Sequence, residues 1–119
     1  MSTETTPQPK KIRLTDENVT DLLDCAGTGI GYWAASATVD KEAKTYRVIE
    51  RSEELPDDET PTDKTITFDE IRDAFNTLAQ QDRLPDWQMR EIADGDLAFD
   101  AEVADMTVQQ AMFGEIVFG

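Results

Sequence analysis

The 119-residue chain contains no histidine and a single cysteine, Cys25. One cysteine excludes a disulfide within the chain, and the two shortages together remove nearly every zinc, haem or iron–sulfur scheme. Histidine-based nucleophilic triads are excluded as well. We therefore expect no cofactor and no metal site, and the low cysteine content favours a cytoplasmic protein.

Long apolar runs are missing too. No segment approaches the roughly 20 apolar residues that a membrane-spanning helix needs. The opening stretch "MSTETTPQPKK" lacks the apolar core of a signal peptide. The sequence thus predicts a protein that makes no membrane contact.

Basic residues are few. Lysine and arginine number 11 against 26 aspartates and glutamates, which gives a formal net charge of −15. Such a charge opposes direct binding to DNA, RNA or anionic lipid, because all of these are polyanions. It favours basic partners, among them proteins that hold nucleic acid.

The length suggests one domain. We expect a disordered tail at 1–11, then a single α+β domain at 12–119 with an exposed acidic loop at 52–64. Residues 30–39 and 45–51 are rich in β-branched and aromatic residues around a short polar stretch, which predicts a β-hairpin.

About four helices are expected to pack on this hairpin or small antiparallel sheet. Their predicted N-caps are Thr15, Thr67, Asp86 and Asp100. Glycines at 27 and 29 are expected to end the first helix, and a short extended piece from Lys64 precedes the second. The closing "EIVFG" reads as a strand or a packed tail.

Two glycine or acid patterns resemble ligand sites without matching them. "GTGIG" at 27–31 has its third glycine one place early for a dinucleotide fingerprint and follows a helix, so it is interpreted as a turn. "DGDLAFDAEVAD" at 94–105 places Ala98, Phe99 and Asp105 where a calcium loop needs a ligand, a glycine and a glutamate. Specific calcium binding is not expected.

Cys25 and the tryptophans Trp33 and Trp87 are interpreted as packing residues. A reactive thiol would need positive neighbours, whereas Asp24 is negative. Base-stacking aromatics are interleaved with lysine or arginine, and no base flanks Trp33.

Clustered carboxylates are the remaining candidates for function. On one helix, neighbours three or four residues apart lie about 5–6 Å apart, similar to the phosphates of a nucleic-acid strand. We expect Asp16, Glu17, Asp21 and Asp24 on the outer face of the first helix. The candidate partner-binding residues are Glu53, Glu54, Asp57, Asp58, Glu59, Asp69, Glu70, Asp73, Asp94, Asp96 and Asp100.

The same acids have a simpler explanation. Carboxylates at helix starts favour the helix dipole, and high negative charge promotes solubility or adaptation to salt. The sequence leaves both explanations open.

The sequence resembles a group of small proteins encoded by phages and prophages, mainly of actinobacteria. The segments that carry the resemblance are "LTDENV", "GIGYWA" at 29–34, "TFDEIRDAF" and the tail "DAEVADMTVQQAMFGEIVFG" at 100–119. The tail is the most specific, while Thr28 stands where the group has a glycine. The resemblance implies a mobile-element origin, an α+β fold and a bacterial host cell, and it implies no catalytic residues.

These observations favour a non-enzymatic inhibitor that binds a basic nucleic-acid-binding host defence protein, such as a CRISPR effector subunit or a restriction enzyme, and blocks its access to DNA by mimicry. One alternative is an accessory phage protein for replication or assembly that binds through its apolar tail. A further alternative is a small hydrolase.

Overall fold

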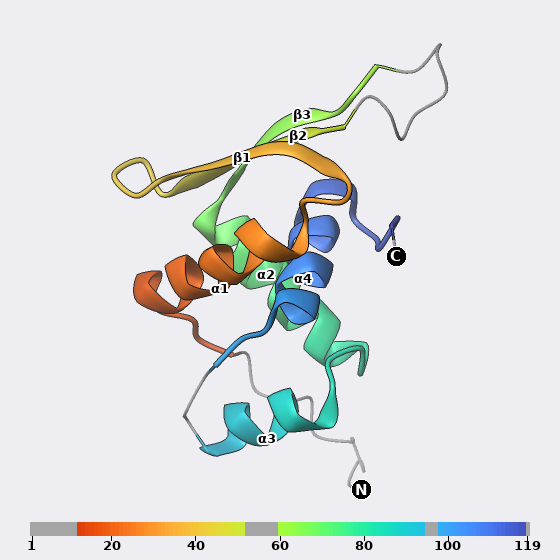
Figure 1. The fold of residues 1–119 in the computed structure, drawn as a ribbon. Coiled ribbons are helices and arrows are strands. Elements are labelled where there is room, and N and C mark those ends of the chain that lie inside the picture. Colours follow the sequence, from red (N-terminus) through yellow and green to blue (C-terminus); the bar gives the residue numbers. More distant parts are fainter. Residues whose placement is uncertain (1–11, 52–59, 95–97, 119) are drawn as a thin grey trace, which may run out of the picture.

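Three helices lie beneath one face of a three-stranded antiparallel sheet, and a fourth lies farther from it (Figure 1). The computed structural model describes residues 12–51, 60–94 and 98–118. The elements in chain order are α1 (Asp16–Gly29), β1 (Ala34–Asp40), β2 (Thr45–Glu50), β3 (Asp63–Thr67), α2 (Phe68–Gln80), α3 (Asp86–Asp94) and α4 (Ala101–Phe113). The predicted α+β class is confirmed.

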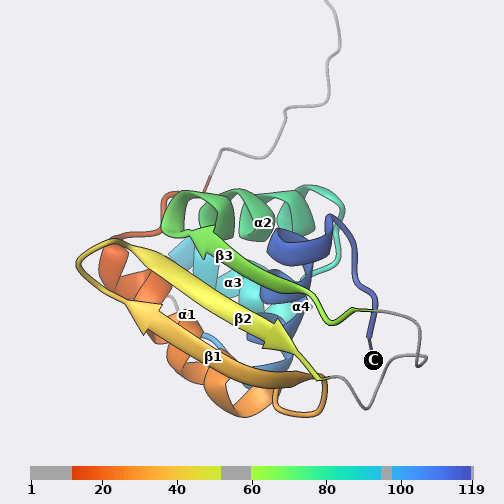
Figure 2. The ribbon, with the colours of Figure 1, turned by 90° about the horizontal axis from the view of Figure 1, so that it is seen from above.

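The sheet has the order β1-β2-β3, with both pairs antiparallel. Seen from above, its outer face is open and α1, α2 and α4 lie on the other side (Figure 2). The predicted hairpin is confirmed, although its first strand begins at Ala34 rather than at residue 30 because residues 30–33 turn back from α1.

The third strand shortens the predicted acidic loop. That loop was expected at 52–64, but Asp63 and Lys64 already belong to β3, where they lie opposite Ile49 and Val48 of β2. Pairing with β2 satisfies the backbone groups of this segment, which a loop would leave to water. The predicted tail at 1–11 and the loop residues 52–59 lie outside the described residues.

The core lies between the sheet and the helices. Tyr46, Val48 and Ile66 face inward from β2 and β3 and are buried. Trp33 is fully buried, as predicted, and it is the largest side chain in this core. A second feature of the packing is the close approach of α1 to α4, where Gly29 lies against the backbone of Ala101.

Three of the four predicted helix starts are confirmed. Thr15 and Thr67 form capping boxes with the third helical residue, and Asp100 accepts a hydrogen bond from the backbone of α4. The prediction for Asp86 is wrong. The carbonyl of Pro85 accepts the bond from Met89, so Asp86 is already helical and lies in the first turn, where a carboxylate suits the dipole.

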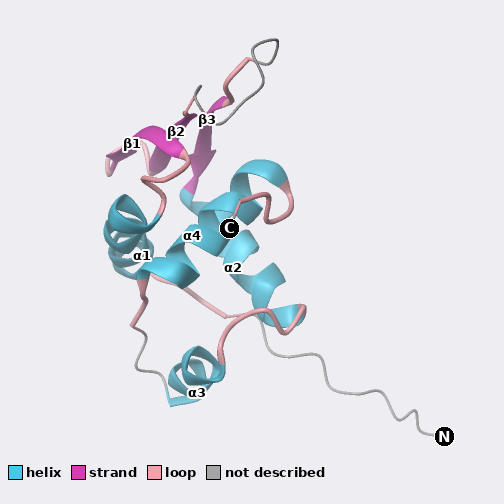
Figure 3. Ribbon diagram, turned by 45° about the vertical axis from the view of Figure 1, so that its right-hand side comes forward, coloured by secondary structure: helices cyan, strands magenta, loops and turns pink. Residues whose placement is uncertain are grey.

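The first helix continues past Gly27 and ends at Gly29. The closing segment is a packed tail, since residues 115–118 form no strand. Figure 3 shows α3 set apart from the sheet at the far end of the helical layer. Trp87 of this helix is half-buried against the core, in line with the packing role expected for it.

Candidate acidic interface

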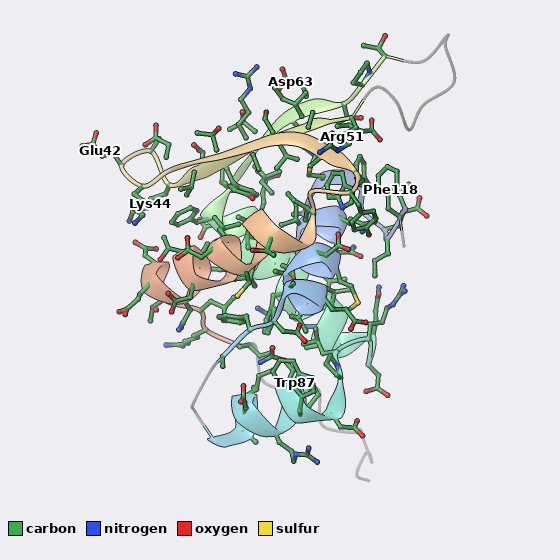
Figure 4. The ribbon with its side chains drawn as sticks, viewed as in Figure 1. Glu42, Lys44, Arg51, Asp63, Trp87 and Phe118 are labelled. Carbon is green, nitrogen blue, oxygen red and sulfur yellow. The ribbon has the colours of Figure 1, made fainter. Side chains whose placement is uncertain are left out.

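Two of the acids on α1 and α2 are neutralised by one arginine. Arg72 of α2 donates to carboxylate oxygens of Asp16 and Asp69, and its Nε donates to the carbonyl of Leu14 at 2.7 Å. Lys44 also pairs with Asp16 at 2.9 Å, pointing from the hairpin turn toward the start of α1 (Figure 4). The pKa of Asp16 is lowered, first by the Lys44 hydrogen bond and then by Arg72.

Two further predicted acids cap helices. Glu70 accepts a 2.9 Å bond from the amide of Thr67, and Asp100 accepts a 2.8 Å bond from the amide of Val103. Both side chains therefore stabilise helix starts, as the solubility explanation anticipated. Glu70 and Asp69 are consequently poor candidates for a partner surface, because a partner would have to replace contacts that they already make.

Asp105, which is half-buried, accepts three hydrogen bonds from other side chains of the chain. Its Oδ1 accepts bonds of 2.8 Å from Trp33 Nε1 and from Gln109 Nε2, and its Oδ2 accepts a 2.6 Å bond from the Tyr32 hydroxyl. Burial and the hydrogen bond to Asp105 raise the pKa of Tyr32 to about 12. This carboxylate links the segment before β1 to the middle of α4.

Gln109 extends the same network to the tail. Its Oε1 accepts from the amides of Val117 at 2.8 Å and Phe118 at 2.7 Å, and its Nε2 donates to the Phe118 carbonyl at 3.2 Å. The Phe118 ring, labelled in Figure 4, stacks on Trp33 with centroids 5.2 Å apart. The "GIGYWA" segment and the closing tail, which the sequence singled out separately, thus meet at one structural junction.

The acids of α1 that make no ion pair with a described residue lie where this helix passes the start of α4, whose N-cap is Asp100. Desolvation and then the charges of Asp24, Asp100 and Asp21 raise the pKa of the Cys25 thiol. The Cys25 Sγ lies 3.4 Å from the Phe99 carbonyl, so the residue after Asp24 contacts the residue before Asp100. Glu17 lies one turn before Asp21 on the same exposed side of α1. We name Glu17, Asp21, Asp24 and Asp100 the α1–α4 acidic face.

No lysine or arginine of the described residues forms an ion pair with the α1–α4 acidic face. Cys25 itself is half-buried and directs its Sγ to the Phe99 carbonyl at 3.4 Å. A raised pKa keeps it a thiol, so the packing role expected for it is the better interpretation.

The predicted candidates therefore separate into three groups. Asp69, Glu70 and Asp100 make the internal contacts above, while Asp73 is exposed on α2. The side chain of Asp94 and the whole of Asp96 lie outside the described residues, as do Glu53, Glu54, Asp57, Asp58 and Glu59. Of the four acids expected on the outer face of the first helix, Glu17, Asp21 and Asp24 are free of internal ion pairs and Asp16 is not.

A hollow of about 560 Å³ is lined by Ile12, Arg13, Leu14, Asp69, Arg72 and Asp73. Arg72 in this hollow donates its hydrogen bonds to Leu14, Asp69 and Asp16. Within residues 12–51, 60–94 and 98–118, no three histidines, cysteines or carboxylates are grouped to hold a metal ion. Over the same residues, no helix is long and apolar enough to cross a membrane.

Comparisons of the chain with models of protein families, with curated proteins and with solved structures find no match. The resemblance to the phage-encoded group therefore stays a prediction.

Proposed function

We propose that this protein is a non-enzymatic inhibitor of a basic nucleic-acid-binding protein. It binds the cationic surface on which that protein holds DNA and so excludes the nucleic acid. The resemblance to phage proteins makes a bacterial defence protein, such as a CRISPR effector subunit or a restriction enzyme, the expected target, met in the cytoplasm of the host cell.

The observation that carries this proposal is the α1–α4 acidic face. Its four carboxylates come from two separate segments, which meet where Cys25 of α1 contacts Phe99, the residue before Asp100. Like charges placed together destabilise a fold by repulsion, and solubility alone needs no such grouping. A net charge of −15 adds long-range steering toward a basic target.

Competition with DNA provides the test. The full chain is immobilised, proteins from a bacterial lysate are captured at low salt, and each captured protein is assayed for binding to labelled duplex DNA with and without the chain. We expect stoichiometric loss of DNA binding that weakens steeply as salt rises, because screening shortens the reach of surface charges to about 10 Å at 0.1 M.

A matched pair of double variants distinguishes an effect of the acidic face from an effect of net charge. Glu17→Lys/Asp24→Lys changes the acidic face, and Asp86→Lys/Glu115→Lys makes the same change of charge at exposed sites elsewhere. Glu17 and Asp86 both occupy first helical turns, so the helix-dipole effect is matched. We expect about tenfold weaker competition from the first variant and a clearly smaller loss from the second. Equal losses would contradict an organised interface.

One observation favours the alternative of an accessory protein that binds through its tail. Tyr32 and Val117, which are 48% and 54% exposed, are the two large apolar side chains left most open to solvent in the described chain, and Gln109 contacts both residues. Val117→Ser would abolish capture of such a partner, whereas it leaves competition with DNA unchanged under the inhibitor proposal.

A further inference from the structure

The outer edge of β1 is open. β1 is the first strand in the sheet order, and no other described strand pairs with it beyond β2. Residues 35–39, "ASATV", contain no charge and no proline. Proteins usually protect an edge strand with lysine, proline or a cover, and β1 has only a register shift near its start.

The backbone hydrogen bonds of β2 show which backbone groups of β1 point to this edge. In β2 the amide of Glu50 donates to Thr62 at 2.8 Å, and Phe68 donates to Lys44 just before β2 at 3.0 Å. Hydrogen bonds in a strand alternate between its two neighbours. Even-numbered residues of β2 therefore bond toward β3, and odd-numbered residues bond toward β1.

In β1, Ala37 lies opposite Val48 and Val39 lies opposite Tyr46. Since these partners bond toward β3, the N–H and C=O groups of Ala37 and Val39 point away from β2 to the open edge. Their side chains share the inner face with the buried Val48 and Tyr46, yet both are only half-buried. A further strand here would pair the backbone groups and complete the burial.

Helix α1, which lies beside this edge, carries exposed acidic side chains. Helix α1 runs along the hairpin, from the Lys44–Asp16 ion pair at one end to the bond from Ala34 to the Ile30 carbonyl at the other. Viewed from above, coils of α1 extend beyond β1 (Figure 2). On this helix Asp16 pairs with Lys44 of the hairpin turn, and Glu17, Asp21 and Asp24 are exposed.

We propose that β1 accepts an extended basic segment of a partner protein as a fourth strand, with lysine or arginine at alternate positions on the side of the exposed acids of α1. Backbone pairing with Ala37 and Val39 supplies affinity, and the acids of α1 select the sign of the side chains. This inference rests on the proposed function for the basic character of the partner.

A second copy of this chain is a poorer occupant. Pairing of two β1 edges would bring together two α1 helices that carry the same exposed carboxylates, and each copy has a net charge of −15. The charge complementarity therefore favours a cationic strand over self-association.

The test uses the full chain and a peptide of about eight residues with blocked ends, in which lysine alternates with threonine. The readout is hydrogen exchange of individual amides. We expect the amides of Ala37 and Val39 to become protected when the peptide binds. The same peptide with N-methyl groups on the residues that would pair should bind about tenfold more weakly, since it cannot form the ladder.

Val39→Pro is the matched change in the protein. It removes an outward amide without touching the bonds to β2, and proline is tolerated on an edge strand. We expect about tenfold weaker peptide binding with an unchanged fold. A glutamate-threonine peptide should not bind. The N-methyl peptide keeps the test valid if this variant unfolds.

Three outcomes would overturn the inference. These are no binding of the lysine peptide at low salt, binding that leaves Ala37 and Val39 unprotected, and protection that rises with protein concentration without peptide. If any of these occurs while the chain still competes with DNA, strand pairing at β1 is disproved and the proposed function is retained. If the peptide protects these amides but the chain does not compete with DNA, strand pairing at β1 is supported and the proposed function is disproved.

Discussion

The indole Nε1 of Trp33 donates a 2.8 Å hydrogen bond to Oδ1 of Asp105, across 72 positions of sequence. The bond joins the fully buried centre of the core to a carboxylate at its margin. It accounts for one acid of a very acidic chain without reference to any partner. It also makes Asp105 a sensitive point for stability.

We predict that Asp105→Ala lowers the free energy of unfolding by about 2–3 kcal/mol, because Trp33 Nε1 and Gln109 Nε2 each lose an acceptor where water has poor access. Urea unfolding measures the loss. Asp73→Ala, an exposed acid on α2, should change stability by less than about 0.5 kcal/mol. Similar values for both variants would contradict the structural role of Asp105.

Gln109 should hold the C-terminal tail against α4 through its hydrogen bonds to Val117 and Phe118. In Gln109→Ala the amides of Val117 and Phe118 lose their acceptor, so we expect their local opening to become easier by about 1–2 kcal/mol. Hydrogen exchange at these two amides measures the change. Gln110→Ala removes only an exposed bond to the Gly114 carbonyl and should leave both amides protected. Unchanged exchange in Gln109→Ala would disprove the attachment.

The two glycines near the end of α1 should respond in opposite directions to alanine. A Cβ at Gly29 would lie 2.4 Å from the Ala101 carbonyl oxygen, whereas a Cβ at Gly27 would meet nothing within 4 Å. We expect Gly29→Ala to destabilise by about 1–3 kcal/mol through overpacking. Gly27→Ala should stabilise by about 0.5–1 kcal/mol, since alanine favours the helix. Thermal unfolding of both variants checks the pair, and a stabilised Gly29→Ala would refute the close contact.

Stability should fall at alkaline pH. Burial, reinforced by nearby carboxylates, raises the pKa of Tyr32 and of Tyr46 to about 12, from an ordinary value of 10.0. The folded state therefore holds these protons more tightly than the unfolded state does. Their contribution is complete below pH 10 and is lost as the pH rises toward 12.

Urea unfolding across this range measures the effect, and the double variant Tyr32→Phe/Tyr46→Phe provides the control. We expect its stability to depend less on alkaline pH than that of the parent chain. An identical dependence would show that other groups are responsible.

Much of the fold could be read from local patterns. The capping boxes of Thr15 and Thr67 depend on residues three apart, and the hairpin depends on runs of β-branched residues around a polar turn. The packing role of Trp33 was expected because no lysine or arginine flanks it. The start of α3 was misplaced because aspartate is common both as a cap and in the first turn, and only the bonds to Pro85 distinguish the two.

The candidate site was less accessible to sequence reasoning. Asp16 and Asp69 look as free as Asp21 and Asp24 in the sequence, yet Arg72 neutralises the first two from another helix. The signal for Glu17, Asp21 and Asp24 was present in their spacing of four and three. Their association with Asp100 was not, since it depends on the packing of α4 on α1.

The sequence by itself determined the net charge, three of the four helix starts and residues such as Trp33 that enter the core, because each depends on composition or on neighbours within a turn. The tertiary structure alone decided which carboxylates are neutralised, which meet in one place and which strand edge stays open. These properties depend on distances between segments far apart in the chain, and such distances are set only when the helices pack against the sheet.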